Sequence, residues 1–209
     1  MKKLLLLGGS TQQIPAIEYA NKQGYYTVLC DYLPDNPGQH YADKFYCVST
    51  TDKEAILEVA QKEKVNGIIA YASDPAAPTA AYVAEKMGLP SNPYESVEVL
   101  TNKDKFRAFL ARHGFATPKA RGYCLVEDAK RDLRHFKMPV LIKPVDSSGS
   151  KGVNILSDIR DLERKADYAL SFSRAKRFII EEYVDKFGYQ VAGDGFSVDG
   201  KLVFRCFAN

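Results

Sequence analysis

The residues best suited to chemistry follow a short apolar run, Val140–Ile142, which has the length and β-branching of a buried strand. The run leads into Lys143, and residues 146–152 then form a loop of glycines, serines and charged side chains. Backbone N–H groups and hydroxyls of such a loop can converge on phosphate oxygens, because glycine lets the backbone approach closely. Lys143 would add a point charge at the base of the loop. The pattern predicts a phosphate-binding loop, although a mobile serine-glycine turn with an exposed lysine would have the same residues.

The loop does not follow the Walker pattern. That pattern, G-x-x-x-x-G-K-[ST], leads into a helix, whereas here the apolar residues resume over 153–156 and predict a return strand. A phosphate site at this loop would therefore lie between two strands.

Composition excludes several classes of protein. The chain has 209 residues, of which 45% are hydrophobic, enough for one large or two small domains with real cores. A net charge of +3, without a basic run interleaved with aromatics, argues against a nucleic-acid partner. The apolar run at residues 4–7 ends at Gly8, too early for a signal peptide, and no stretch approaches the roughly 18 residues of a membrane span. We expect the four cysteines, which lie far apart, to be buried core thiols of a reduced, cytoplasmic protein.

Strands and helices alternate through the first half of the chain. Apolar strands are expected at residues 4–7, 26–31, 45–48 and 67–71, and helices at about 14–23, 51–64 and 74–87. A capping box at residues 51–54 predicts the start of the second helix, and Asp74 followed by Pro75 predicts the start of the third. This alternation predicts a parallel sheet wound by right-handed crossovers. Residues 1–95 are therefore predicted to form a Rossmann-like domain.

The turn after the first strand, Gly8-Gly9-Ser10, does not meet the G-x-G-x-x-G fingerprint of dinucleotide-binding folds. Asp31 ends the second strand, where such folds place the acid that binds a ribose. One matching acid beside a broken glycine pattern disfavours an oxidoreductase that uses NAD or FAD. The hypothesis that this turn and the following helix N-terminus bind a small anion stays open.

The second half mixes strands and helices in another order. Helices are expected at 96–100, 102–112, 127–136 and 162–170, and strands at 120–125, 140–142, 153–156, 178–184, 189–198 and 201–207. Thr101 is expected to cap the second of these helices, and an Asp199-Gly200 turn predicts a hairpin of the last two strands. Lys103 falls in the first turn of its helix, where a cation opposes the helix dipole unless an anion lies nearby. It is either a solvated surface lysine or a second anion ligand.

Four pieces in this order resemble the ATP-grasp superfamily, and most closely its biotin carboxylase-like and carbamoyl-phosphate-synthase-like members. The first piece is the Rossmann-like domain. Asn102-Lys103, with Phe106 and residues 114–118, is similar to the family's D-K-x-x-F…G-x-x-T-P. Lys143-Pro144 and its loop are similar to K-P-x-x-S-x-G-S-x-G, and residues 180–184 to the family's hinge. The ordered set spans the chain and is more specific than any one piece.

The resemblance implies a nucleotide site. Lys103 and Lys143 would contact the phosphates of ATP, because two cations can offset a polyphosphate charge that one could not. The serine-glycine loop would close over those phosphates as a lid that excludes water. Glu181 would accept a hydrogen bond from the adenine amino group. Gln190 stands where many members have a glutamate that holds the ribose.

The backbone after Glu181 would bracket the adenine edge, through the carbonyl of Glu182 and the N–H of Val184. The nucleotide-binding set that the resemblance implies is Lys103, Lys143, Ser147, Ser148, Gly149, Ser150, Gly152, Glu181, Glu182, Tyr183, Val184 and Gln190.

The resemblance also implies a fold and a division of the chain. The expected class is α/β, with a Rossmann-like pre-ATP-grasp domain at residues 1–95 and a linker and helix carrying Lys103 at 96–120. A lid subdomain at 121–185 and the start of a C-terminal lobe at 186–209 would form a partial ATP-grasp domain. In the family, an acid and an E-x-N-x-R-like stretch hold magnesium further along. We expect ATP and Mg²⁺ as cofactors, with the magnesium ligands beyond Asn209 and with little catalysis by this chain alone.

The activity that the resemblance implies is that of an ATP-dependent ligase, which activates a carboxylate as an acyl phosphate for attack by an amine or a related nucleophile. The alternative is a nucleotide-responsive binding module without ligase activity. The ligands would be ATP and a small carboxylate, with no nucleic-acid or membrane partner, and a homodimer stays open. No catalytic or metal-ligating residue is assigned, and His40, His113 and His135 receive no role.

Overall fold

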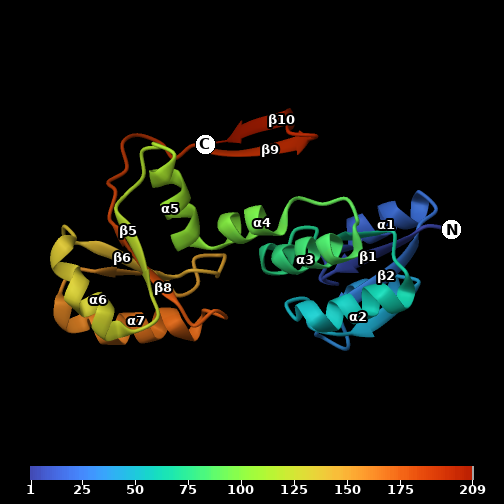
Figure 1. Cartoon of the computed structure of the whole chain (residues 1–209), viewed down its shortest axis with the longest axis horizontal. Coiled ribbons are helices and arrows are strands. Elements are labelled where there is room, and N and C mark those ends of the chain that lie inside the picture. Colours follow the sequence, from blue (N-terminus) through green and yellow to red (C-terminus); the bar gives the residue numbers. More distant parts are fainter. Residues whose placement is uncertain (209) are drawn as a thin grey trace.

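Three β-sheets organise the chain in a computed structural model that describes residues 1–208 (Figure 1). One four-stranded sheet lies toward the N-terminus, a second follows, and a two-stranded hairpin comes last. Helix α4 (Tyr94–Thr101) lies between the two larger sheets, and α5 (Lys103–Arg112) lies beside the second of them. The α/β class predicted from the sequence is confirmed. Within residues 1–208, none of the helices has the length and apolarity to cross a membrane.

The first sheet is parallel throughout, as its alternation with helices predicts. Its order is β3-β2-β1-β4, with β1 at Lys3–Leu7, β2 at Tyr26–Asp31, β3 at Lys44–Cys47 and β4 at Gly67–Ile69. Parallel strands that are buried on both faces have continuous apolar runs, and residues 4–7 are such a run.

Helices cover both faces of this sheet. α1 (Ile14–Lys22) packs Ile17 against β1 and β2 on one face. α2 (Lys53–Glu63) and α3 (Ala77–Met87) cover the other face, which holds the larger core. Short 3₁₀ turns occur at Pro37–His40, Asp74–Ala76, Leu133–His135 and Ile159–Asp161.

Two helix caps differ from the sequence-based prediction. α2 is capped by Asp52, whose side chain accepts from the Ala55 N–H at 3.1 Å, and not by Thr51. Thr101 does not cap α5, because its hydroxyl donates to the carbonyl of Val97 within α4 at 2.7 Å. Thr and Asp side chains can form hydrogen bonds with several nearby backbone groups, and residue spacing alone does not show which bond forms.

The second sheet is antiparallel and is covered by helices on one face. Its order is β5-β8-β6-β7, with β5 at Ala120–Tyr123, β6 at Val140–Pro144, β7 at Asn154–Leu156 and β8 at Phe178–Glu182. α6 (Val126–Asp132) and α7 (Leu162–Ser171) pack on the face that holds Ile142 and Ile180. The opposite face carries the alternate residues of each strand and lies against α5.

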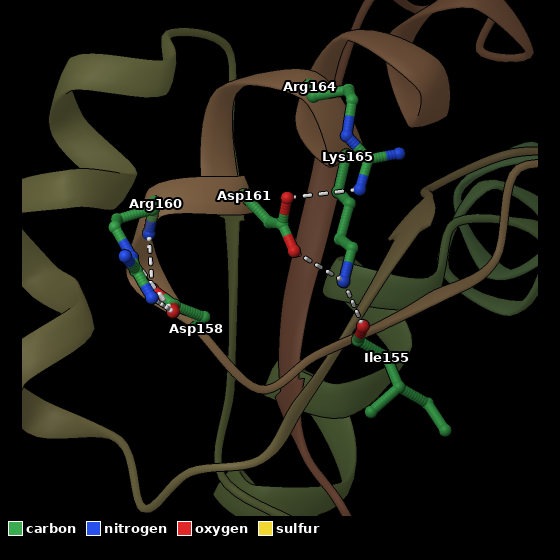
Figure 2. Close-up of polar contacts among 6 residues, drawn as sticks. All are labelled: Ile155, Asp158, Arg160, Asp161, Arg164 and Lys165. Carbon is green, nitrogen blue, oxygen red and sulfur yellow. Dashed lines mark hydrogen bonds and ion pairs between the residues drawn. The ribbon is translucent and has the colours of Figure 1, made fainter.

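Ion pairs lie within the start of α7, and one carbonyl contact joins this helix to the edge of the sheet (Figure 2). Asp161 accepts from Arg164 at 3.1 Å and lies 3.5 Å from the Lys165 ammonium group. Lys165 also donates to the carbonyl of Ile155 on β7 at 2.7 Å. The Lys165 contact thus joins β7, the strand that follows the serine-glycine loop, to α7.

The last two strands form the predicted hairpin, β9 (Ala192–Val198) with β10 (Lys201–Ala208). Both turn residues, Asp199 and Gly200, have positive φ, at 49° and 73°, as a two-residue hairpin turn requires. Residues 192–208 are all exposed, and the hairpin stands apart from the second four-stranded sheet (Figure 1).

The cysteines do not all behave as predicted. Cys30 is buried in the first sheet, and burial together with the neighbouring Asp31 charge raises its pKa to about 12. Cys47, Cys124 and Cys206 are exposed, so the prediction of buried core thiols is wrong for these three.

A buried carboxylate, Glu63, ties the end of α2 to β1 and β3. Its Oε2 accepts from Lys3 at 2.8 Å, and its Oε1 accepts from Lys44 at 2.7 Å and from the Tyr46 hydroxyl at 2.5 Å. Hydrogen bonds from Lys3, Lys44 and Tyr46 stabilise the charged form, so the pKa of Glu63 falls from 4.5 to about 2.

We expect Glu63→Gln to lower the free energy of unfolding at neutral pH. A carboxylate whose pKa is lowered in the folded state stabilises the fold above its ordinary pKa of 4.5, and this contribution is lost as the pH falls toward about 2. The difference between wild type and variant should therefore shrink below pH 4.5. Urea denaturation from neutral to acidic pH measures it, with the exposed Glu58→Gln on the same helix as control. A difference that does not change with pH would contradict the assignment.

Candidate functional site

Lys143 on β6 and Glu181 on β8 lie side by side on the face of the second sheet that α6 and α7 leave uncovered. Their neighbours Ile142 and Ile180 point into the core on the other face, so strand alternation turns these two charged residues away from it. The Lys143 ammonium lies 2.8 Å from Glu181 Oε1, and the two side chains are only 14% and 6% exposed. The pair is thus a buried ion pair at the base of the serine-glycine loop.

Helix α5 places a second cation on the same carboxylate. Arg107 Nε donates to Glu181 Oε2 at 2.6 Å, and Arg107 Nη2 donates to Oε1 at 3.3 Å. Burial alone would raise the pKa of Glu181, but the hydrogen bonds from Arg107 and Lys143 outweigh it, so that pKa is lowered. Glu181 is therefore ionised, with both oxygens engaged by cations.

Lys103 reaches the loop from the first turn of α5. Its backbone N–H donates to the carbonyl of Val145 at 2.9 Å, and its ammonium group donates to the carbonyl of Ser147 at 2.5 Å. Burial lowers the pKa of Lys103, and the nearby charge of Lys143 lowers it further. The structure thus brings the two predicted lysines into one region, although 40 positions separate them.

The predicted lid is held at both ends and open at its tip. The Asp146 carboxylate accepts from Ser173 Oγ at 2.7 Å and from the Ala175 N–H at 2.9 Å. Ser148, Gly149 and Ser150 are exposed.

Gly152 closes the loop at its far end. Its φ is 75°, and a Cβ atom there would lie 2.7 Å from Pro144 Cγ. Glycine is required at this position for both reasons, the backbone angle and the close approach.

A cavity of about 780 Å³ lies between the loop and the first sheet's helices. Its volume is in the range of sites for small ligands. The lining residues are Thr51, Lys53, Asp74, Pro75, Pro78, Thr79, Glu98, Leu100, Thr101, Asn102, Lys103, Asp146, Ser147, Ser148, Arg174 and Ala175. Lys103 and two loop serines face this cavity, whereas Lys143 and Glu181 do not line it.

The residues predicted to contact adenine follow directly from β8. Glu182 is half-buried, and its N–H donates to the carbonyl of Lys119 at 2.9 Å. Tyr183 and Val184 are exposed just after the strand ends. Gln190 is exposed before β9, and no hydrogen bond within residues 1–208 joins it to the lysine pair. The structure therefore groups the lysines, the loop and Glu181, but it does not bring Gln190 to them.

Asp31 has a structural role at the turn after β1. Its side chain is buried, with Oδ2 accepting from the Gly9 N–H at 2.7 Å and Oδ1 from the Leu33 N–H at 2.9 Å. The carboxylate holds the turn closed and is not presented as a ribose ligand.

Sequence reasoning missed Arg107, and it also missed the pair of Asp104 with Arg177. Asp104 contacts Arg177 beside Gly122, where helix α5 meets β5. A signal for Arg107 was present, because it lies four positions after Lys103 and so shares its helix face. No signal marked Arg177 as the partner of Asp104.

Comparison with known proteins shows what the chain as a whole is similar to. No family model matches the chain. A formate-dependent phosphoribosylglycinamide formyltransferase of a Nitratiruptor species is 32% identical over 193 residues, which is 90% of this chain and 49% of the relative. A carbamoyl phosphate synthase large chain of Thermotoga petrophila is 25% identical over 88% of this chain and 18% of the relative.

A solved structure is similar to this chain in fold. The biotin carboxylase domain dimer of the Hydrogenobacter thermophilus 2-oxoglutarate carboxylase, solved with MgADP, ADP and bicarbonate, matches with a TM-score of 0.67. The identity is 20%, and the match covers 88% of this chain and 44% of that one.

These relatives and structural neighbours are ATP-grasp enzymes, and the chain fits a fragment of such an enzyme. It spans about half the length of the formyltransferase relatives that it matches. The superfamily resemblance inferred from the four sequence pieces is therefore confirmed. The domain limits and the individual nucleotide contacts stay predictions.

We expect Gly152→Ala to destabilise the protein more than Gly149→Ala. Both glycines have positive φ, at 75° and 65°, so both substitutions carry a backbone cost of about 1–2 kcal/mol. Gly149 has open space around it, whereas a methyl group at Gly152 would overlap Pro144. Urea denaturation of the two variants measures the difference, and equal losses would show that the packing at Gly152 relaxes freely.

Proposed function

We propose that this chain is the ATP-binding part of an ATP-dependent ligase. The observation that carries the proposal is the convergence of Lys103 and Lys143 at the base of the serine-glycine loop. Glu181 compensates Lys143, whereas the ammonium group of Lys103 binds a neutral carbonyl, and the triphosphate of ATP would supply an anion to both lysines. The loop hydroxyls and N–H groups would bind further phosphate oxygens.

The adenine would lie along the end of β8. The carbonyl of Glu182 and the N–H of Val184 would bind its edge, and Glu181 would accept from its amino group. Oε1 of Glu181 already accepts from Lys143 and Arg107, and Oε2 accepts from Arg107, so the adenine amino group would be a second donor to Oε2. A carboxylate has enough lone pairs for that.

The reaction proposed for the whole protein joins a carboxylate to a nucleophile. A carboxylate oxygen attacks the γ-phosphorus of ATP, ADP leaves, and the resulting acyl phosphate is attacked by an amine that displaces phosphate. This forms a carbon–nitrogen bond. The bicarbonate in the biotin carboxylase domain structure supports a small carboxylate as the substrate. The cavity beside Lys103 would hold it, and the dimer named there supports a homodimer.

Magnesium does not fit the described residues as a resident ion. Within residues 1–208, no group of three or more His, Cys, Asp or Glu side chains is arranged to hold a metal. ATP as a magnesium complex, as in the MgADP complex of the structural neighbour, is therefore proposed without ligands from this part of the chain.

A second candidate is a nucleotide-responsive module without ligase activity. ADP release by the whole protein with a set of small carboxylates distinguishes the two candidates, because a module would bind ATP without turnover.

We expect Lys103→Ala to weaken ATP binding at least about tenfold, the size of one lost charge-assisted hydrogen bond. Lys103 is a cleaner test than Lys143, because its ammonium group binds a neutral carbonyl and its loss leaves no buried charge unpaired. Fluorescence titration with a labelled ATP analogue measures the affinity. Lys105→Ala, a more exposed lysine on the same helix, serves as control. Unchanged affinity in Lys103→Ala would remove the phosphate role.

A further inference from the structure

Arg107 and Lys143 bind Glu181 in different ways. Arg107 uses two nitrogen atoms, at 2.6 Å and 3.3 Å, and contacts both carboxylate oxygens. Such a fork fixes the orientation of a carboxylate as well as neutralising it. Lys143 makes a single bond of 2.8 Å, to Oε1. Lys143 can therefore move away from Glu181 while Arg107 keeps the carboxylate paired.

Glu181 needs a cation throughout, because its side chain is only 6% exposed. A buried carboxylate that loses its partner is strongly destabilising. If Lys143 were the sole partner, the phosphates of a nucleotide would compete with Glu181 for one ammonium group. Nucleotide would then bind only against the cost of an unpaired buried charge.

The position of Arg107 allows it to stay paired with Glu181 when Lys143 moves away. It lies on the same face of α5 as Lys103, one turn further along, so a single helix carries one cation to the loop and another to Glu181. Asp104, on the same helix, contacts Arg177 just before β8, which holds the helix against the strand that carries Glu181. The Asp104–Arg177 contact therefore helps to keep Arg107 on the helix close to Glu181 on the strand.

From these contacts we infer that Arg107 is a positioning residue, which keeps Glu181 paired and so frees Lys143 for the phosphates of a nucleotide. The inference rests on the proposed ATP site. Arg107 acts through Glu181 and need not touch the ligand. Removing the charge of Glu181 should therefore make Arg107 dispensable.

A double-mutant cycle tests this dependence. The full chain is compared with Arg107→Ala, Glu181→Gln and the double variant, with ATP and with tripolyphosphate as ligands. We expect Arg107→Ala to raise the Kd for either ligand about tenfold when Glu181 is present. In the Glu181→Gln background the same change should raise Kd less than about twofold. Glu181→Gln also loses the proposed contact with adenine. Both proteins compared in the Glu181→Gln background lack this contact, so its effect on the change in Kd cancels. Tripolyphosphate has no adenine, so its Kd does not depend on this contact.

Equal losses in the two backgrounds would overturn the inference, because Arg107 would then act on the ligand or on the fold. No loss in either background would overturn it as well. Absence of saturable ATP binding by the wild type would instead refute the proposed function, and this inference with it.

Arg107→Lys keeps the test decisive if Arg107→Ala does not fold, as judged by circular dichroism. Lysine retains the charge but not the two-nitrogen fork. We expect it to weaken binding about threefold in the Glu181 protein, a fraction of one such hydrogen bond, and not measurably in the Glu181→Gln protein. An equal effect in the two backgrounds would count against the inference.

Discussion

The buried carboxylate of Glu181 is the constraint on which the second half of the molecule depends. Removing a carboxylate from water is expensive, and the single bond from Lys143 would leave its other oxygen without a partner. The arginine on α5 completes the set, so three elements, β6, β8 and α5, must meet at one point. Burial and pairing act on Glu181 in opposite directions, and pairing prevails, because its pKa is lowered.

The same arrangement makes the two lysines unequal. Lys143 is neutralised by Glu181, whereas Lys103 donates to a neutral carbonyl and lies close enough to Lys143 to have its pKa lowered. The charge of Lys103 thus lies next to a cavity that the carboxylates Asp74, Glu98 and Asp146 also line. A polyanion that entered there would relieve the repulsion between the lysines, and this electrostatic gain would add to the affinity.

The sequence predicts the elements well where their causes are local, and less well where partners are distant. Apolar runs predicted the parallel strands of the first sheet and the strand that carries Lys143 to the base of its loop. Arg107 was missed because its partner lies 74 positions away, and nothing in either segment identifies the other. The prediction of burial for Cys47 and Cys124 is wrong, because cysteine is usually buried but both of these lie exposed at strand ends.

The serine-glycine loop is fixed at its ends, and this limits how it could cover a ligand. Asp146 at one end and Gly152 at the other are held by hydrogen bonds and by packing, whereas Gly149 has open space around it. A movement over phosphate would therefore fall to the residues between them. Within that stretch, the carbonyl of Ser147 accepts from the Lys103 ammonium group. An ammonium group has three donors, so Lys103 can hold this carbonyl and a phosphate oxygen together, and the lysine that attracts the ligand also restrains the loop that would enclose it.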